Sequence, residues 1–237
     1  RMMTGNNSVH GTAIVMETAT GKIKAIANLG KQPDGSYTED LNYGIGKATE
    51  PGSVFKLATL MSLLEDKHVT INSVVDCEGG KKNFYGLTIR DSHLGYGAIT
   101  VKDAFERSSN VAFAKLADQY YHAQPAKFIN HLHRLRLDTL TGIDLTASSG
   151  KPTIKKPTNR SWSKTTIPYM AHGYEELVTP LHLLMLYNAV ANNGKMMKPY
   201  LVSSIKQYGV EVRTIKPTVL VEKICSDETL AQVKECL

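Results

Sequence analysis

The stretch TEPGSVFKLATLMSLLED, residues 49–66, decides the fold because it predicts a helix that is apolar on almost every face. Pro51 and Gly52 mark its start, and the absence of a polar stripe is typical of a central, buried helix. One residue conflicts with that environment: Lys56 follows Ser53 by one turn, and no acid stands at helical spacing to pair with it. Lysine is rarely fully buried unless it is paired or used, so Lys56 requires a chemical explanation.

Ser53 and Lys56 are spaced to act together, because residues i and i+3 share one face of a helix. Serine is a poor nucleophile without a base beside it. Burial lowers the pKa of a lysine, and the neutral amine can then accept a proton. The alternative is a lysine whose stem packs while its head reaches water. The pattern alone leaves both open, because S-x-x-K recurs at Ser148/Lys151, Ser161/Lys164 and Ser203/Lys206.

The residues before this helix predict a β-hairpin. In GTAIVMETATGKIKAIANLG, residues 11–30, strands are expected over 12–18 and 23–29, with ATGK as the turn. Ile23, Ala25, Ala27 and Leu29 are expected on one face of the second strand, opposite Lys24, Ile26 and Asn28.

The residues after it predict several capped helices. Thr100 and Asp103 resemble a capping box, and the triplet Ser108-Ser109-Asn110 is expected at the break between two helices. Thr179 and Pro180 open a further helix that ends before Gly194, and Ser226 caps a last one. The segment 199–212 is strand-like, and DSHLGYG, residues 91–97, is expected to be a turn, with an approach to the site as the alternative. The order of elements favours an α+β fold.

Charge and composition exclude several classes of protein. The formal charge is +6, but the densest basic run, Lys151, Lys155, Lys156, Arg160 and Lys164, lacks an aromatic ladder or a nucleic-acid motif. We interpret it as a solvated loop and predict no nucleic-acid partner, although a protein working near an acidic cell-surface polymer would look the same. No apolar run approaches the roughly 18 residues of a membrane span.

The cysteines, histidines and N-terminus give weaker indications. Cys77, Cys225 and Cys236 lack zinc spacing, and their odd number leaves at most one bridge open. His131 and His133 face different ways on a helix, so no metal site is predicted. The N-terminus RMMTGNNSVH has no apolar core of a signal peptide, and its first residue is Arg, so we expect a piece of a longer chain.

Longer strings carry a family resemblance. EPGSVFK (50–56) resembles the active-site block of class B penicillin-binding proteins, and RSSNVAFAKLA (107–117) resembles their second block. The segment 161–194 resembles the one that precedes their third motif, and TGIDL (141–145) also fits, although TASSG (146–150) departs from the usual continuation. The resemblance covers nearly the whole chain and looks closest to the septal, division-type D,D-transpeptidases.

The resemblance implies a fold and a set of roles. The fold would be the penicillin-binding-protein/β-lactamase-like transpeptidase fold, an antiparallel sheet packed with helices plus an all-α subdomain. Ser53 would be the acyl nucleophile, Lys56 its general base and Ser108 a proton relay, while Asn110 would bind the substrate amide and help to hold Lys56. No metal or organic cofactor is implied.

The resemblance also implies substrates, partners and a location. The substrate would be the D-Ala–D-Ala end of a peptidoglycan stem peptide, and β-lactam antibiotics would trap Ser53. Division-machinery proteins would be partners. The parent protein would act on the extracytoplasmic side of the cytoplasmic membrane, anchored through a segment absent from this chain.

One part of the family pattern is missing. The chain contains no K-[ST]-G triplet, and SKTT at Ser163 stands too early to replace it, so Lys164 is interpreted as a surface lysine. We therefore expect a transpeptidase domain truncated before that motif, without the C-terminal strands, and inactive or nearly so by itself. The expected organisation is one partial domain: a hairpin and active-site helix (8–64), a mainly helical subdomain (65–195), and a strand with a C-terminal helix (196–237).

Two other functions stay open. A non-catalytic β-lactam sensor or degenerate transpeptidase-like scaffold would also lack the third motif. A serine β-lactamase would share the first two blocks, but it would need a residue that activates water, and the sequence offers no residue for that task.

Overall fold

The structure is a computed structural model that describes residues 2–145 and 150–237. Its contacts divide the chain into two compact units, each assembled from three segments. The first unit contains Arg1–Thr49, Thr139–Pro152 and Val178–Ile224. The second unit contains Glu50–Asp138, Thr153–Leu177 and Cys225–Leu237. The predicted division into three consecutive segments stays a prediction.

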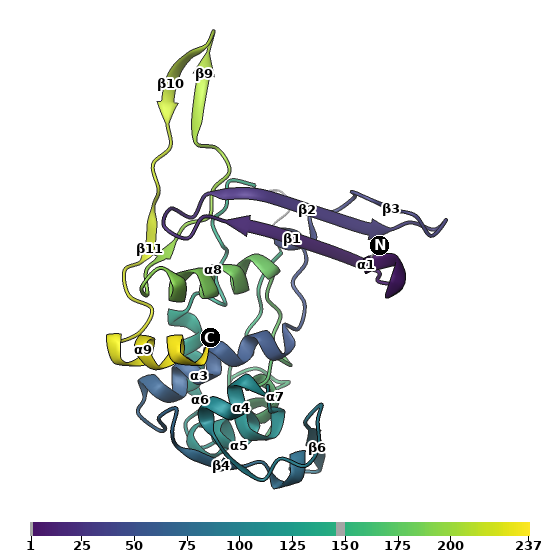
Figure 1. The fold of residues 1–237 in the computed structure, drawn as a ribbon, viewed down its shortest axis with the longest axis vertical. Coiled ribbons are helices and arrows are strands. Elements are labelled where there is room, and N and C mark those ends of the chain that lie inside the picture. The colour runs from purple at the N-terminus through teal and green to yellow at the C-terminus, as the bar shows by residue number, and fades with distance from the viewer. Residues whose placement is uncertain (1, 146–149) are drawn as a thin grey trace. The chain divides into compact units, whose positions relative to one another are not determined.

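The first unit is built on the predicted hairpin. Strands β1 (His10–Met16) and β2 (Ile23–Lys31) pair antiparallel, and the short β3 (Tyr37–Thr38) extends the sheet beyond β2. Helix α8 (Pro180–Ala191) contacts β1 and lies alongside the hairpin (Figure 1). The short helices of this unit are α1 (Met2–Gly5) and α2 (Tyr43–Gly46).

The predicted alternation along β2 holds from Ala25 to Leu29 and fails at Ile23. Ala25, Ala27 and Leu29 are exposed on one face and Asn28 is buried on the other, but Ile23 is buried as well. The cause is a β-bulge on β2: Val15 pairs with Ala25 and Met16 with Ile23, which leaves Lys24 as the extra residue. A bulge opposes unequal numbers of residues on the two strands, so the alternation of side chains changes phase along β2.

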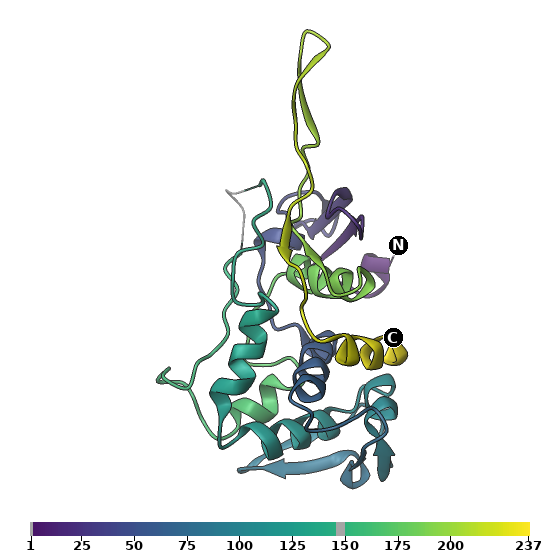
Figure 2. The same cartoon turned by 90° about the vertical axis from the view of Figure 1, so that its left-hand side faces the viewer.

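The strand-like segment 199–212 is two strands rather than one. Strands β9 (Ser204–Gln207) and β10 (Val210–Thr214) form a hairpin that stands away from the rest of the first unit (Figures 1 and 2). Tyr208 and Gly209 form its turn with φ of 48° and 84°, the left-handed backbone that tight hairpins need. Strands β8 (Met196–Met197) and β11 (Val219–Val221) pair nearby.

The second unit surrounds the predicted central helix. A 3₁₀ turn, Gly52–Phe55, leads directly into α3 (Lys56–Glu65), and every residue from Lys56 to Leu64 is buried. Helices α5 (Asn110–Tyr121), α6 (Pro125–Arg134) and α9 (Asp227–Cys236) contact α3, and Figure 2 shows α9 beside it. The remaining helices of this unit are α4 (Val101–Glu106) and α7 (Thr166–Met170).

The predicted helix boundaries are confirmed where a side chain caps the helix. Thr100 accepts a hydrogen bond from the backbone of Asp103 at the start of α4. Ser109 caps α5, so the serine–serine–asparagine triplet does stand between two helices. Ser226 caps α9 through Thr229. The second unit also contains four short strands, paired as β4 (Val74–Asp76) with β7 (Ala98–Thr100), and β5 (Lys81–Phe84) with β6 (Leu87–Arg90).

Several further predictions can be compared with the structure. The architecture is α+β, as expected. Lys164 lies on the surface, and all three cysteines are free thiols. His131 pairs with Asp66 and His133 with Asp138, so the two rings serve different local contacts. Among residues 2–145 and 150–237, none of the helices has the length and apolar character required to cross a membrane.

Candidate active site

The 3₁₀ turn and α3 bring Ser53 and Lys56 together in the second unit. The Nζ atom of Lys56 lies 3.0 Å from the Oγ atom of Ser53. Ser53 is exposed, whereas Lys56 is 1% exposed, so the hydroxyl faces solvent and the amine lies beneath it. This excludes the alternative of a lysine whose head reaches water.

The break between α4 and α5 brings Ser108 and Asn110 to the same amine. Lys56 Nζ lies 2.9 Å from Ser108 Oγ, 2.7 Å from the Ser108 carbonyl oxygen and 2.6 Å from Asn110 Oδ1. Ser108 adopts a left-handed backbone with φ of 55°, an uncommon conformation for a residue other than glycine that is frequent at functional sites. All four residues singled out from the sequence therefore meet at one atom.

The hydrogen-bonding partners of this amine are compatible with its neutral form. The Ser108 carbonyl and Asn110 Oδ1 can only accept, and the Asn110 amide is oriented because its Nδ2 donates to the Arg90 carbonyl. A neutral amine has two N–H groups, which these two acceptors use, and one lone pair. That lone pair is left to accept a hydrogen bond from the hydroxyl of Ser53 or Ser108, which is the arrangement a general base needs.

The environment lowers the pKa of Lys56 in the same direction. Burial disfavours the ammonium form and lowers the pKa from 10.5 to about 8, against an opposing attraction from the Asp91 carboxylate. A substantial fraction of Lys56 is therefore neutral slightly above neutral pH. This confirms the direction of the shift that the apolar helix predicted.

Asp91 is a residue of this site that the sequence did not single out firmly. Its carboxylate accepts a hydrogen bond of 2.9 Å from the Ser109 hydroxyl and another of 2.9 Å from the backbone N–H of Val111. It is 7% exposed and thus anchors the start of α5, next to Asn110. The segment 91–97 had been expected to be a turn, and its first residue does approach the site. An acid directly after a strand, ahead of a capped helix, was the available signal.

The segment Ala171–Gly173 also packs against the Ser53–Lys56 face. The hydroxyl of Thr59, one turn after Lys56, donates to the Ala171 carbonyl at 2.9 Å, and the Gly52 N–H donates to the Gly173 carbonyl at 2.9 Å. Gly173 has φ of 94°, and a Cβ atom there would stand 2.0 Å from the Gly52 carbonyl oxygen. Only glycine permits this close approach beside the candidate nucleophile.

His172 is held between these two hydrogen bonds. It is 4% exposed, and neither ring nitrogen has a hydrogen-bond partner among the described residues. Burial and the nearby charge of Lys56 lower the pKa of His172 to about 4, so the ring is neutral at physiological pH. A histidine gives no sequence signal of this kind, because its burial depends on a packing contact between segments far apart in the chain.

The other candidate groups do not join this site. The Ser161/Lys164 and Ser203/Lys206 pairs lie elsewhere, with both lysines exposed, and Ser148 lies outside the described residues. In residues 2–145 and 150–237, no group of three or more histidine, cysteine or acidic side chains is arranged to hold a metal ion.

Comparison with known proteins places this geometry in context. PbpB of Mycolicibacterium smegmatis, a penicillin-binding protein, is 26% identical over 81% of this chain and 30% of its own length. The peptidoglycan D,D-transpeptidase FtsI of Escherichia coli is 29% identical over 80% of this chain and 32% of its own length. The chain thus spans about a third of the length of these relatives.

The fold and the family agree. The crystal structure of penicillin-binding protein 3 from Mycobacterium tuberculosis, complexed with aztreonam, superposes with a TM-score of 0.80. It is 22% identical, and the match covers 99% of this chain and 53% of that one, so the expected transpeptidase fold is confirmed. The family described as the penicillin binding protein transpeptidase domain matches residues 11–237. The chain therefore belongs to the transpeptidase domain family of the penicillin-binding proteins.

Proposed function

We propose that the protein is an acyl-serine D,D-transpeptidase that cross-links peptidoglycan stem peptides and is a target of β-lactams. The observation that carries this proposal is the buried Lys56 amine, held within 3.0 Å of Ser53 Oγ by Ser108 and Asn110. Its lowered pKa, about 8, supports a role as base at the pH of growth.

The proposed reaction has two acyl-transfer steps. Neutral Lys56 takes the proton of Ser53, whose Oγ attacks the penultimate D-Ala carbonyl of a donor stem peptide. Terminal D-Ala leaves as the amine after it receives a proton through Ser108. The amine of a second stem peptide then attacks the acyl-serine, gives up a proton along the same route, and releases Ser53 with the new cross-link formed.

The remaining assignments follow from the same proposal. Asn110 Oδ1 is 2.6 Å from Lys56 Nζ and positions the base, while the second N–H of its Nδ2, which also donates to the Arg90 carbonyl, is assigned to the substrate peptide. The substrate and the site of action lie outside the cytoplasmic membrane, where the wall is assembled, with division-machinery proteins as partners. The resemblance to septal transpeptidases supports these last assignments, and the chemistry requires no cofactor.

The test is a measurement of intact mass after incubation with a penicillin. We expect an adduct of the mass of the penicillin on the 237-residue chain and no adduct on Ser53→Ala. An adduct of equal yield on Ser53→Ala would contradict the assignment of the nucleophile. A folded wild-type chain that gains no mass would contradict an acylation-competent site in this polypeptide.

A β-lactam sensor or a non-catalytic scaffold is the second candidate. The observation that favours it is the absence of a K-[ST]-G triplet in these 237 residues. Loss of an oxyanion-stabilising donor costs about 10²–10³ in rate, so we expect no sustained release of D-Ala from a D-Ala–D-Ala peptide by this chain. Acylation without D-Ala release fits a sensor, whereas turnover would contradict both the scaffold reading and the expected inactivity.

A further inference from the structure

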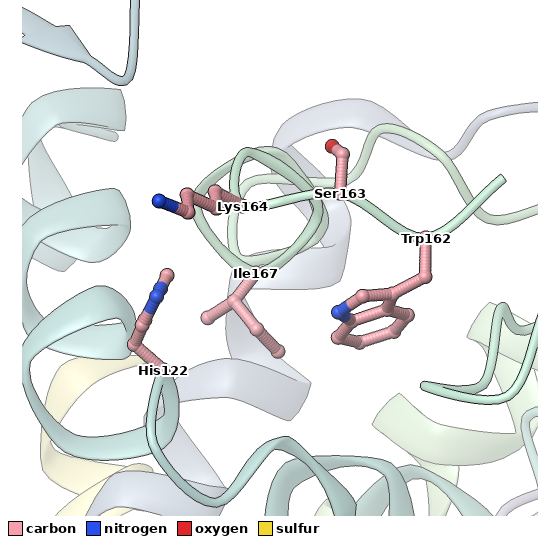
Figure 3. Close-up of a pocket in the computed structure, with 5 residues that line it drawn as sticks. All are labelled: His122, Trp162, Ser163, Lys164 and Ile167. Atoms are coloured by element: carbon pink, nitrogen blue, oxygen red, sulfur yellow. The ribbon is translucent and has the colours of Figure 1, made fainter.

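A pocket lies at the end of α5 that is remote from Asn110. It has a volume of about 300 Å³, and Figure 3 shows the side chains that line it. They are His122, Trp162, Ser163, Lys164 and Ile167, all from the second unit. Helix α5 has 12 residues, so at 1.5 Å per residue its two ends lie about 18 Å apart. The pocket is therefore separate from the Ser53 site.

The pocket wall contains hydrogen-bond donors that have no acceptor among the described residues. Within the described residues, neither the Lys164 ammonium nor the Trp162 indole N–H has a hydrogen-bond partner; in Figure 3 the Lys164 amine points toward His122, and the Trp162 indole lies on the other side of Ile167. An ammonium and an indole N–H can only donate. The pocket therefore offers groups suited to an acceptor-rich, negatively charged ligand.

His122 is fixed in the wall by its neighbours. Its Nδ1 atom lies 3.0 Å from Asp118 Oδ1, and the Asp118 carboxylate also accepts from the Tyr85 hydroxyl at 3.1 Å. The Tyr85 ring stacks on the imidazole with 5.0 Å between centroids. An imidazole whose one nitrogen is occupied in this way presents its remaining edge to the pocket in a fixed orientation.

The other side chains add an apolar component. Ile167 is buried and forms one wall, and the indole ring of Trp162 lies across from it (Figure 3). Donors beside an apolar wall match a ligand that carries a carboxylate next to an aliphatic portion. A simple inorganic anion would use the donors and leave the apolar surface uncovered.

Basic side chains in the segment 156–164 add to the preference of the pocket for a carboxylate. Lys156, Arg160 and Lys164 recur at every fourth position, are exposed, and make no ion pair within the described residues, whereas Lys155 pairs with Glu175. Lys156 also lines a second pocket, of about 380 Å³, beside α6. Unpaired cations of one segment, two of which each line a pocket, suit a polymer with repeated carboxylates better than a single small ion.

We propose that this pocket and the cations beside it bind a carboxylate-bearing stem peptide of the wall polymer at a second site, remote from Ser53. The identity of the polymer rests on the proposed function, while the preference for a carboxylate rests on the pocket. A second contact of this kind holds the polymer near the catalytic site and raises its effective concentration there.

The experiment uses the only tryptophan of the chain as its probe. Because Trp162 lines the pocket, its fluorescence is titrated with the peptide L-Ala-γ-D-Glu-L-Lys-D-Ala-D-Ala and with the same peptide after methyl esterification of its carboxylates. We expect saturable binding of the free acid and binding at least about tenfold weaker for the ester, since hydrogen bonds to charged groups are the stronger ones. Equal binding of both peptides, or no saturable change, would overturn the proposal.

Matched variants locate the binding. Lys164→Ala is expected to weaken the free acid about tenfold, as one charge-assisted hydrogen bond is lost. Lys151→Ala removes an exposed lysine of the same segment that lines neither pocket, and it is expected to leave the affinity unchanged. If both variants weaken the binding of the free acid equally, the binding depends on the overall charge of the segment, and the proposed pocket site would be overturned.

Failure of this proposal is distinguishable from failure of the proposed function. Ser53→Ala abolishes penicillin acylation if Ser53 is the nucleophile, and it is expected to leave the Trp162 titration unchanged. Lys164→Ala is expected to leave penicillin acylation unchanged. A fluorescence response that is lost from the penicillin-acylated chain would show that the peptide is bound at the catalytic site, and it would overturn the second site.

Discussion

Replacing Lys56 with methionine is expected to remove an unusual rise of stability with pH. The folded pKa of Lys56 is about 8, and its ordinary value, which applies to the unfolded chain, is 10.5. Between these values the unfolded state binds more protons than the folded state, so raising the pH favours the folded state. The direction is opposite to that of a lysine stabilised by an ion pair.

The size of the effect follows from the two pKa values. One pKa unit corresponds to about 1.4 kcal/mol, and most of the interval between 8 and 10.5 is crossed by pH 10. From pH 7 to pH 10, the free energy of unfolding of the wild type should therefore rise by about 2.5 kcal/mol relative to Lys56→Met. Other titrating groups are common to both proteins and cancel in this difference.

Urea unfolding at pH 7, 8, 9 and 10 measures this difference. The fluorescence of Trp162 is a suitable signal, because it belongs to the same compact unit as Lys56. Ser53→Ala is the control, since it keeps the buried lysine and should retain the wild-type slope; Lys56→Gln is the substitute if the methionine variant does not fold. Parallel pH dependence of wild type and Lys56→Met would refute the buried, neutralisable lysine.

Three further substitutions test the surroundings of Lys56. Asp91→Asn removes the carboxylate that raises the pKa of Lys56, so the onset of the alkaline rise in urea stability, which marks the folded pKa, should move below pH 8; an unchanged onset would contradict this. Gly173→Ala places a Cβ atom 2.0 Å from the Gly52 carbonyl oxygen, so thermal unfolding should show a loss of at least about 2 kcal/mol, and wild-type stability would be inconsistent with that contact. As the pH falls from 7 to 4, the free energy of unfolding of the wild type should drop by about 3 kcal/mol because of His172, whose pKa is 6.5 in the unfolded chain and about 4 in the folded chain. His172→Phe should not show this drop in acid denaturation, and its persistence would argue against His172.

The parts of the site that the sequence predicted are those with a local pattern. The spacing of Ser53 and Lys56 fixes their proximity as soon as the segment is helical, and the apolar residues around them fix the burial. The break at Ser109 is visible as a capping residue between two helices. That Ser108 and Asn110 meet Lys56, 52 and 54 positions away, came from the family resemblance, because no periodicity reports such a contact.

The parts that escaped prediction depend on contacts between distant segments. From the sequence, Asp91 is expected to be a turn residue, and only the structure shows that the backbone N–H of Val111, at the start of α5, donates to its carboxylate. The sequence does not distinguish His172 from any other histidine. Its burial depends on the hydrogen bonds that its two neighbours in the chain accept from Thr59 and Gly52. The change of phase at Ile23 in β2 arises in the same way, because a bulge is defined by the pairing of two strands and the sequence of one strand does not report it.

The electrostatics of Lys56 follow from which neighbours are neutral as well as from which are charged. His172 is a base held neutral by burial, with its pKa lowered to about 4. It therefore supplies no charge that would fix the protonation state of the lysine. Desolvation lowers the pKa of Lys56 and the Asp91 carboxylate raises it, and the balance of the two gives a pKa of about 8. An amine poised in this way is sensitive to one carboxylate, so under the proposed mechanism Asp91, though it makes no hydrogen bond to Lys56, would shift the pH at which Lys56 can activate Ser53.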